Sequence, residues 1–183
     1  MEIIVILGVI ALIVLFLIAQ YNRLIRLNIG VDEAYAQIEV QLKRRSDLIP
    51  NLVEAVKGYA KHEQSTFDAV VTARAKATSA SSVADVAAAD GMLTQALRGL
   101  LAVAEAYPDL KASANFISLQ EELATTENKV AFSRQFYNDN VRSLNTAVKT
   151  VPTNFFAGFA KVAEREFYEV EDPQDRKAPQ VTF

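Results

Sequence analysis

Apolar residues recur every three or four positions from Val31 to Ala77, which is typical of a helix with one buried face. The stripe consists of Val31, Ala34, Ile38, Leu42, Arg45, Ile49, Leu52, Val56, Tyr59, Glu63, Phe67, Val70, Ala73 and Ala77. Pro50 falls inside this pattern, and proline usually ends or kinks a helix because it lacks an amide proton. Because the stripe keeps its phase on both sides of Pro50, the pattern predicts one long helix with a kink there.

Two further helices follow a polar break at residues 78–82 (TSASS). Ser82 and Asp85 resemble a capping box at the start of the second helix, which Pro108 ends. Ser113 is a good cap for a third helix that runs from Ala114 to about Thr150, before Pro152. The apolar positions of the second helix are Val86, Leu93, Leu97, Leu100, Leu101, Ala104 and Tyr107.

The third helix carries a long stripe that charged residues interrupt. Its members are Phe116, Leu119, Leu123, Glu127, Val130, Arg134, Tyr137, Val141, Leu144 and Val148. Phe132 and Phe136 are expected to widen its buried arc. After Pro152, a short apolar helix or turn containing Phe155, Phe156, Phe159 and Val162 is expected to cover one end of the bundle.

The N-terminus carries an unbroken apolar run from Ile3 to Ala19, and no charge appears between Glu2 and Arg23. With the next three residues it predicts a membrane anchor over residues 3–22. The alternative is a cleaved signal peptide, which needs a basic start and a small-residue cleavage site. The chain begins Met-Glu and lacks that site. Because Arg23 and Arg26 follow the run, the positive-inside rule places the bundle in the cytoplasm and the N-terminus outside.

These patterns predict an all-α protein: a single N-terminal transmembrane helix, then an antiparallel bundle of three long helices plus a short fourth. The expected parts are an anchor over residues 1–27, the bundle over 28–169 and an extended acidic tail over 170–183. The segment Asn28–Gly30 is interpreted as a hinge between anchor and bundle. One unbroken helix through this point is the alternative.

Composition limits the chemistry that the chain can perform. There is no cysteine, so disulfides and thiolate metal sites are excluded. The net charge of −3 argues against a surface that binds nucleic acid. His62 is the single histidine, and no glutamate stands three residues before it, so the di-iron pattern of helical bundles is absent. We therefore expect no catalytic residue, cofactor or metal, although a carboxylate-only site built from Glu63, Glu121, Glu122 and Glu127 stays open.

Charged residues on the buried stripes form the main candidate site: Arg45, Glu127 and Arg134. They could bind a polar ligand, or they could form a structural network that fixes helix register. We favour the structural network and expect Arg45 to be buried against Glu127 or another acid of the third helix.

A second polar group has two open interpretations, a partner-binding face or a solvated side that makes some interhelical hydrogen bonds. It comprises Asn128, Asn138, Asp139, Asn140, Arg142 and Asn145.

Four segments of the chain resemble the LemA family of bacterial membrane-anchored helical proteins. They are VDEAYAQIEVQLKRRSDLIPNLVEAVKGYAKHE, LLAVAEAYPDLKAS, FISLQEELATTENKVAFSRQFYND and the final PQVTF. The resemblance implies an anchored helical bundle and, loosely, a role in membrane organisation and stress.

Together these features predict a non-enzymatic scaffold or protein-interaction module in the bacterial cytoplasmic membrane. It would contact the bilayer through residues 3–22 and would bind other copies of itself or other membrane proteins, but no nucleic acid. The expected interaction face is aromatic: Phe132, Phe136, Phe155, Phe156 and Phe159. The alternative is a small-ligand sensor or enzyme that uses the charged interior formed by Arg45, Glu127 and Arg134.

Overall fold

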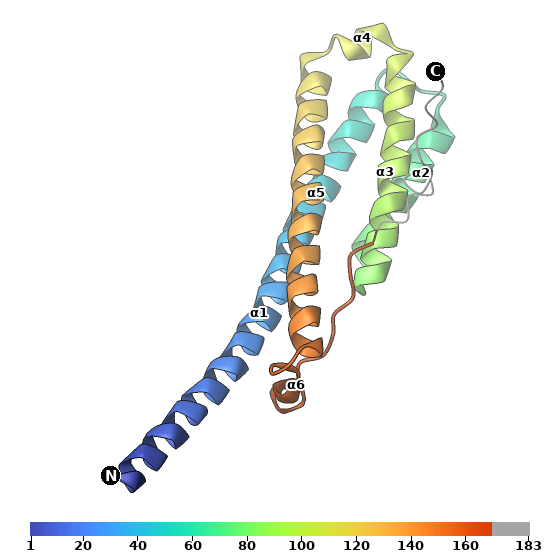
Figure 1. Ribbon diagram of the computed structural model, residues 1–183. Helices are drawn as coiled ribbons and strands as arrows, with labels where there is room; N and C mark the ends of the chain where they lie inside the picture. Colours follow the sequence, from blue (N-terminus) through green and yellow to red (C-terminus); the bar gives the residue numbers. More distant parts are fainter. Residues whose placement is uncertain (170–183) are drawn as a thin grey trace, which may run out of the picture. The chain divides into compact units, whose positions relative to one another are not determined.

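The computed structural model describes residues 1–169, and all regular secondary structure within that range is helical. Figure 1 shows the helices in chain order. They are α1 (Glu2–Lys57), α2 (Gln64–Ser79), α3 (Val83–Glu105), α4 (Pro108–Lys111), α5 (Ala114–Lys149) and α6 (Asn154–Ala160). The predicted all-α class is confirmed, and so is the long apolar helix at the N-terminus. The predicted tail over 170–183 lies outside the described residues.

The hinge expected at Asn28–Gly30 is absent, because α1 is a single helix of 56 residues that passes straight through it. Gly30 has another role there. A Cβ added to Gly30 would lie 3.2 Å from Oδ1 of Asn140 on α5, so glycine permits a close approach of the two helices. A glycine inside a helix costs only about 0.5–1 kcal/mol relative to alanine, which does not break a helix that packs on a neighbour.

Pro50 lies inside α1, as predicted, and the chain does not reverse between Ser46 and Asn51. Because proline has no amide proton, the carbonyl of Ser46 one turn earlier loses its helical partner. The structure supplies a substitute from the neighbouring helix: Nε of Arg74 donates to the Ser46 carbonyl at 2.9 Å. This contact explains how the helix tolerates Pro50.

The prediction of one helix from Val31 to Ala77 is wrong, because α1 ends at Lys57 and the chain turns before α2 begins at Gln64. The turn follows Gly58, a poor helix former, and Tyr59 is exposed where the stripe expected burial. Ala60 is fully buried instead. The apolar spacing resumes in phase after the turn, so periodicity alone does not reveal the break.

The chain forms two compact units, and the one built from residues 39–132 together with Tyr168 and Glu169 contains the larger core. Parts of α1 and α5 combine with α2, α3 and α4 in this bundle unit, and α2 and α3 lie side by side (Figure 1). Ser82 caps α3 as predicted, with its Oγ accepting from the Asp85 amide at 3.0 Å. The core residues are Ile49, Leu52, Val53, Val56, Ala60, Phe67, Val70, Ala73, Leu93, Leu97, Leu100, Ala104, Leu110, Phe116 and Leu123.

The other unit contains residues 1–38 and 133–167 and is called the anchor unit below. It is built on the first part of α1 and the second half of α5. The buried apolar residues of these two segments are Leu24, Val31, Ala34, Ile38, Tyr137, Val141, Leu144 and Ala147. The rings of Tyr35 and Tyr137 lie 5.7 Å apart. After α6, residues 162–167 run as an irregular segment, which we call the strap.

Polar side chains hold the strap in place. Asn145 donates to the carbonyl of Arg165 and accepts from its amide, both at 2.9 Å. The hydroxyl of Tyr137 donates to the Glu166 carbonyl at 2.9 Å. Lys149 pairs with Glu164 at 2.7 Å, and Arg165 pairs with Asp32. One member of the polar group on α5, Asn145, therefore binds a segment of the same chain.

Candidate functional site

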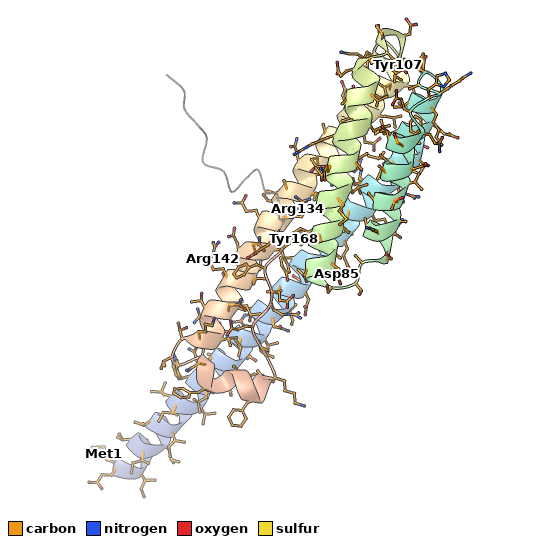
Figure 2. All side chains as sticks on the ribbon, turned by 90° about the vertical axis from the view of Figure 1, so that its right-hand side faces the viewer. Met1, Asp85, Tyr107, Arg134, Arg142 and Tyr168 are labelled. Carbon is orange, nitrogen blue, oxygen red and sulfur yellow. The ribbon has the colours of Figure 1, made fainter. Side chains whose placement is uncertain are left out.

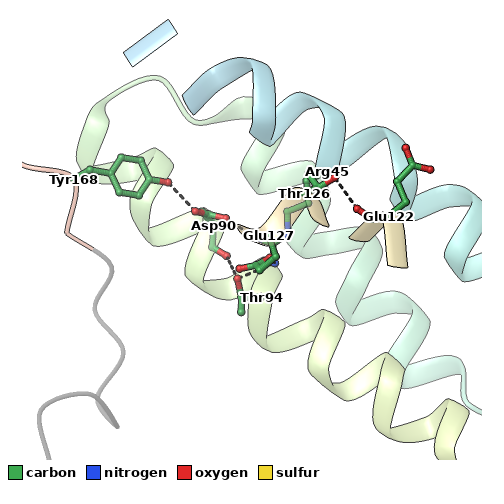
Figure 3. A network of polar contacts seen from close by, with 7 residues as sticks. All are labelled: Arg45, Asp90, Thr94, Glu122, Thr126, Glu127 and Tyr168. Carbon is green, nitrogen blue, oxygen red and sulfur yellow. Dashed lines mark hydrogen bonds and ion pairs between the residues drawn. The ribbon is translucent and has the colours of Figure 1, made fainter. Parts of the chain in front are cut away.

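Arg45 on α1 is the centre of a buried polar network in the bundle unit (Figure 3), and only 1% of its surface is exposed. Its Nη1 donates to Oδ1 of Asp90 on α3 at 2.6 Å. Its Nη2 donates to the hydroxyl of Thr94 at 2.9 Å and lies 2.9 Å from Oε2 of Glu127 on α5. One guanidinium group therefore joins three helices through charge-assisted contacts.

Asp90 is as deeply buried as Arg45, at 1% exposure, and both of its carboxylate oxygens have partners. While Oδ1 accepts from Arg45, Oδ2 accepts from the hydroxyl of Tyr168 at 2.8 Å. Thr94 donates back to the Asp90 carbonyl at 3.0 Å. Figure 3 shows Tyr168 reaching Asp90 from the segment that follows the strap. The network thus ties Tyr168, the residue directly after the strap, to α3.

Removing two charges from water is expensive, and the interaction between them repays that cost only with good geometry and further hydrogen bonds. Arg45 and Asp90 meet these conditions in part. Nε of Arg45 is buried and has no hydrogen-bond acceptor within residues 1–169. A network of this kind adds little net stability over an apolar core, but breaking it strands a buried charge. We therefore interpret it as a device that selects one helix register.

The rim of the network is solvated. Arg44 donates to Glu122 at 3.0 Å, and both side chains are more than 40% exposed. Lys43 and Asp47 form a similar exposed pair on α1. Such pairs contribute about 0–1 kcal/mol each, so the energetics of this region depend on Arg45 and Asp90.

Of the three predicted site residues, the structure brings Arg45 and Glu127 together. Arg134 is half-buried in the anchor unit, and its membership of the network stays a prediction. The sequence analysis missed Asp90, Thr94 and Tyr168. The sequence did contain a signal for Asp90, because Asp90 stands at helical spacing between Val86 and Leu93 in the apolar stripe of α3. Tyr168 lies outside every helix, so helical periodicity could not find it.

The aromatic residues predicted as an interaction face are placed on the surface. Phe132 and Phe136 on α5 are 70% and 41% exposed, and Phe155 and Phe159 on α6 are 67% and 85% exposed. Phe156 is half-buried. The expectation that Phe132 and Phe136 widen the buried arc is therefore wrong, since both are exposed while Thr126 and Ser133 on α5 are buried. In the short apolar segment after Pro152, no residue of α6 is buried, but Val162 is.

The network around Arg45 contains no metal-binding group within residues 1–169. Across the described part of the chain, no three His, Asp or Glu side chains form a metal-binding group, and the carboxylate-only site considered above is not formed. An open groove of about 650 Å³ runs between α2 and α3. Its lining includes Thr72 and Lys76 on α2 and Met92, Gln95 and Gly99 on α3, but no residue of the charged network.

The first part of α1 is long and apolar enough to cross a membrane. An 18-residue window in it has a mean hydropathy of 3.2, and none of that window is buried. Figure 2 shows this segment ending at Met1 with its side chains uncovered. The structure is thus an all-α protein with an exposed apolar helix at its N-terminus.

The model of the LemA family matches residues 34–183. Because this match covers most of the chain, the protein belongs to the LemA family, as the sequence motifs predicted. The family and the apolar helix together indicate a membrane-associated protein.

Three curated relatives are similar over most of this chain. Magnetosome protein MamQ 2 of Paramagnetospirillum magneticum is 23% identical, covering 84% of this chain and 66% of the relative. Magnetosome protein MamQ of Magnetospirillum gryphiswaldense is 23% identical, covering 80% of this chain and 64% of the relative. Protein LemA of Metamycoplasma hominis is 26% identical, covering 76% and 64%. The chain therefore spans slightly less than two thirds of the length of these relatives.

Proposed function

We propose that this protein is a non-enzymatic scaffold, or protein-interaction module, anchored in the bacterial cytoplasmic membrane. Residues 3–22 cross the bilayer, and the bundle lies in the cytoplasm. The observation that carries the proposal is the continuity of α1, whose uncovered apolar segment and first bundle segment are one helix. Arg23 and Arg26, both exposed directly after the apolar run, favour the cytoplasmic side for the bundle.

The burial of the charged network favours a scaffold over a ligand sensor. Arg45 and Asp90 contact each other as well as Thr94, Glu127 and Tyr168, and both are almost fully removed from solvent. A polar ligand would have to displace these partners before it could reach the guanidinium. The network therefore suits a fixed interior better than a binding pocket.

Self-association is the proposed activity of the scaffold, and Phe132 and Phe136 are its proposed contact. They stand four residues apart on α5, so they share one face of that helix. Exposed aromatic residues are enriched where proteins meet partners. Confinement to a membrane raises the effective concentration of neighbouring copies, so weak contacts suffice for assembly.

The assembly is tested by measuring the mass of the full-length protein in detergent by light scattering. We expect an oligomer that shifts toward the monomer in the double variant Phe132→Ser, Phe136→Ser. The matched control is Val71→Ser, which removes an apolar side chain 55% exposed on α2 and should leave the mass unchanged. A strictly monomeric full-length protein would remove self-association and leave only contact with other membrane proteins.

The proposed orientation is tested separately by adding protease to cells whose outer barrier has been opened but whose cytoplasmic membrane is intact. A cytoplasmic bundle is spared until the membrane is lysed. Digestion of the bundle before lysis would place it on the opposite side.

A further inference from the structure

The short helix α6 displays an aromatic surface that nothing in the described chain covers. Phe155 and Phe159 stand four residues apart, on the same face, with 67% and 85% of their surface exposed. Val151, just before the helix, is 70% exposed. Leaving this much apolar surface in water is unfavourable, so we expect an apolar environment to cover it.

A contact to α1 fixes the position of α6 along the proposed membrane anchor. The hydroxyl of Thr153, the residue before α6, lies 3.5 Å from Oε1 of Gln20. Thr153 is 1% exposed, so this junction is packed. Gln20 directly follows the apolar run that ends at Ala19. Thr153 and Gln20 both belong to the anchor unit, and Figure 1 shows α6 beside α1.

The length of the run places this junction at the bilayer boundary. From Ile3 to Gln20, at about 1.5 Å per residue, the helix rises by ~26 Å, whereas the hydrocarbon core of a bilayer is about 30 Å thick. A bilayer that covers the apolar run therefore reaches the level of Gln20. Since Thr153 contacts Gln20, α6 starts in the interfacial layer.

A basic residue follows α6 and another follows the apolar run, as is common for segments that lie in the membrane interface. Lys161, exposed directly after α6, ends the helix in a left-handed conformation with φ 51°. Arg23 is exposed on α1, three residues after Gln20. Long basic side chains can keep their charge among the headgroups while nearby apolar side chains enter the acyl region. Anionic lipids of the cytoplasmic leaflet attract such charges.

We propose that α6 is a second membrane contact, with Phe155 and Phe159 inserted at the edge of the acyl chains and Lys161 among anionic headgroups. This inference rests on the proposed anchoring of α1 and assigns the aromatic residues of α6 to lipid rather than to a protein partner. The protein then contacts the bilayer through two segments, the spanning part of α1 and α6. A single span can spin about its axis, but a second contact beside it restricts that rotation.

The chain contains no tryptophan, so single substitutions give clean fluorescent probes. We would reconstitute the full-length variants Phe155→Trp and Phe159→Trp into vesicles of phosphatidylcholine and phosphatidylglycerol. Parallel vesicles contain phosphatidylcholine brominated at shallow or deep positions of the acyl chain. We expect emission shifted to shorter wavelength, strong quenching by shallow bromines, weaker quenching by deep bromines, and protection from acrylamide in the aqueous phase.

Two control variants calibrate the measurement. Ile10→Trp lies within the apolar run and should be quenched most strongly by deep bromines. Val71→Trp lies on α2, where the native side chain is 55% exposed, and should be quenched by acrylamide and not by bromines.

If Ile10→Trp is quenched by bromines and Phe159→Trp is not, α6 does not touch lipid, and the inference fails while the anchor stands. If neither is quenched, the anchor and the inference fail together. Protection of Phe159→Trp from acrylamide without bromine quenching would mean that protein covers α6, which also overturns the inference. Bromine quenching of Val71→Trp equal to that of Phe159→Trp would mean that the bilayer contact is not specific to α6, with the same result.

Discussion

The two units solve the problem of burial in different ways. In the bundle unit, helical segments of α1, α2, α3, α4 and α5 share one apolar core, and the same unit buries an arginine and an aspartate. In the anchor unit, α1 and α5 are the only long helical segments described, and two helices cannot enclose a core. The strap adds a third layer there. Because the strap has no regular structure, its backbone needs side-chain partners, and Asn145 and Tyr137 supply them.

This difference teaches where each unit is vulnerable. The bundle unit depends on charge balance inside an apolar environment, whereas the anchor unit depends on hydrogen bonds and exposed ion pairs that hold the strap. Substitutions should therefore cost much more in the first than in the second.

The largest effect is expected from Asp90→Ala, which removes the buried carboxylate that accepts from Arg45 and from the Tyr168 hydroxyl. Removing one partner of a buried pair costs about 3–5 kcal/mol. Chemical denaturation of the full-length protein in detergent measures the loss of unfolding free energy. As a control, Glu122→Ala removes the exposed partner of Arg44 and should cost about 0–1 kcal/mol. Equal effects of the two variants would show that the Arg45 network is solvated.

The next largest effect is expected from Arg74→Ala, which leaves the Ser46 carbonyl without a donor. A hydrogen bond from a charged donor contributes about 1.5–3 kcal/mol. Pro50→Ala restores the missing amide of the helix, so the cost of Arg74→Ala should shrink in that background. A double-mutant cycle measures this coupling. Purely additive effects would mean that Arg74 does not compensate for Pro50.

In the anchor unit, Asn145→Ala removes two hydrogen bonds to Arg165, each contributing about 0.5–1.5 kcal/mol. We expect faster amide hydrogen exchange in the strap, measured by mass spectrometry, with unchanged exchange in α3. The control is Asn128→Ala, which changes an exposed asparagine on the same helix. Unchanged exchange at Arg165 would show that the strap is held by other contacts.

The smallest effect concerns Tyr137, whose burial, with smaller contributions from Tyr35 and Glu166, raises the pKa of its phenol above 10.0. The unfolded chain releases this proton near pH 10, while the folded chain retains it. The contribution of Tyr137 to the free energy of unfolding is therefore fully present below about pH 10. It is lost as the pH rises through the higher pKa of the folded state. We expect Tyr137→Phe to cost about 0.5–1.5 kcal/mol at neutral pH and to flatten the loss of stability at alkaline pH. An unchanged alkaline slope would assign that loss to other groups.

The sequence predicts elements whose signal is local. Ser82 and Asp85 mark the start of α3, and Pro152 follows closely on the end of α5, because capping and proline chemistry act within a few residues. The turn after Gly58 was missed because the apolar phase continues across it. Asp90 and Tyr168 were missed for a related reason: their burial depends on residues more than forty positions away, and periodicity carries no information about such pairs. Phe132 and Phe136 show that apolar character alone does not predict burial, because both residues are apolar and exposed.

The continuity of α1 has a consequence for rotational phase. Each residue of an α-helix turns the chain by about 100° and advances it by about 1.5 Å. One residue inserted between Asn22 and Leu24 would thus rotate the apolar run relative to the fully buried Leu24, and four would return it almost to its starting angle, one turn farther along. The number of residues between the apolar run and Leu24 therefore determines which face of the apolar run lies in line with the buried face of α1 in the anchor unit.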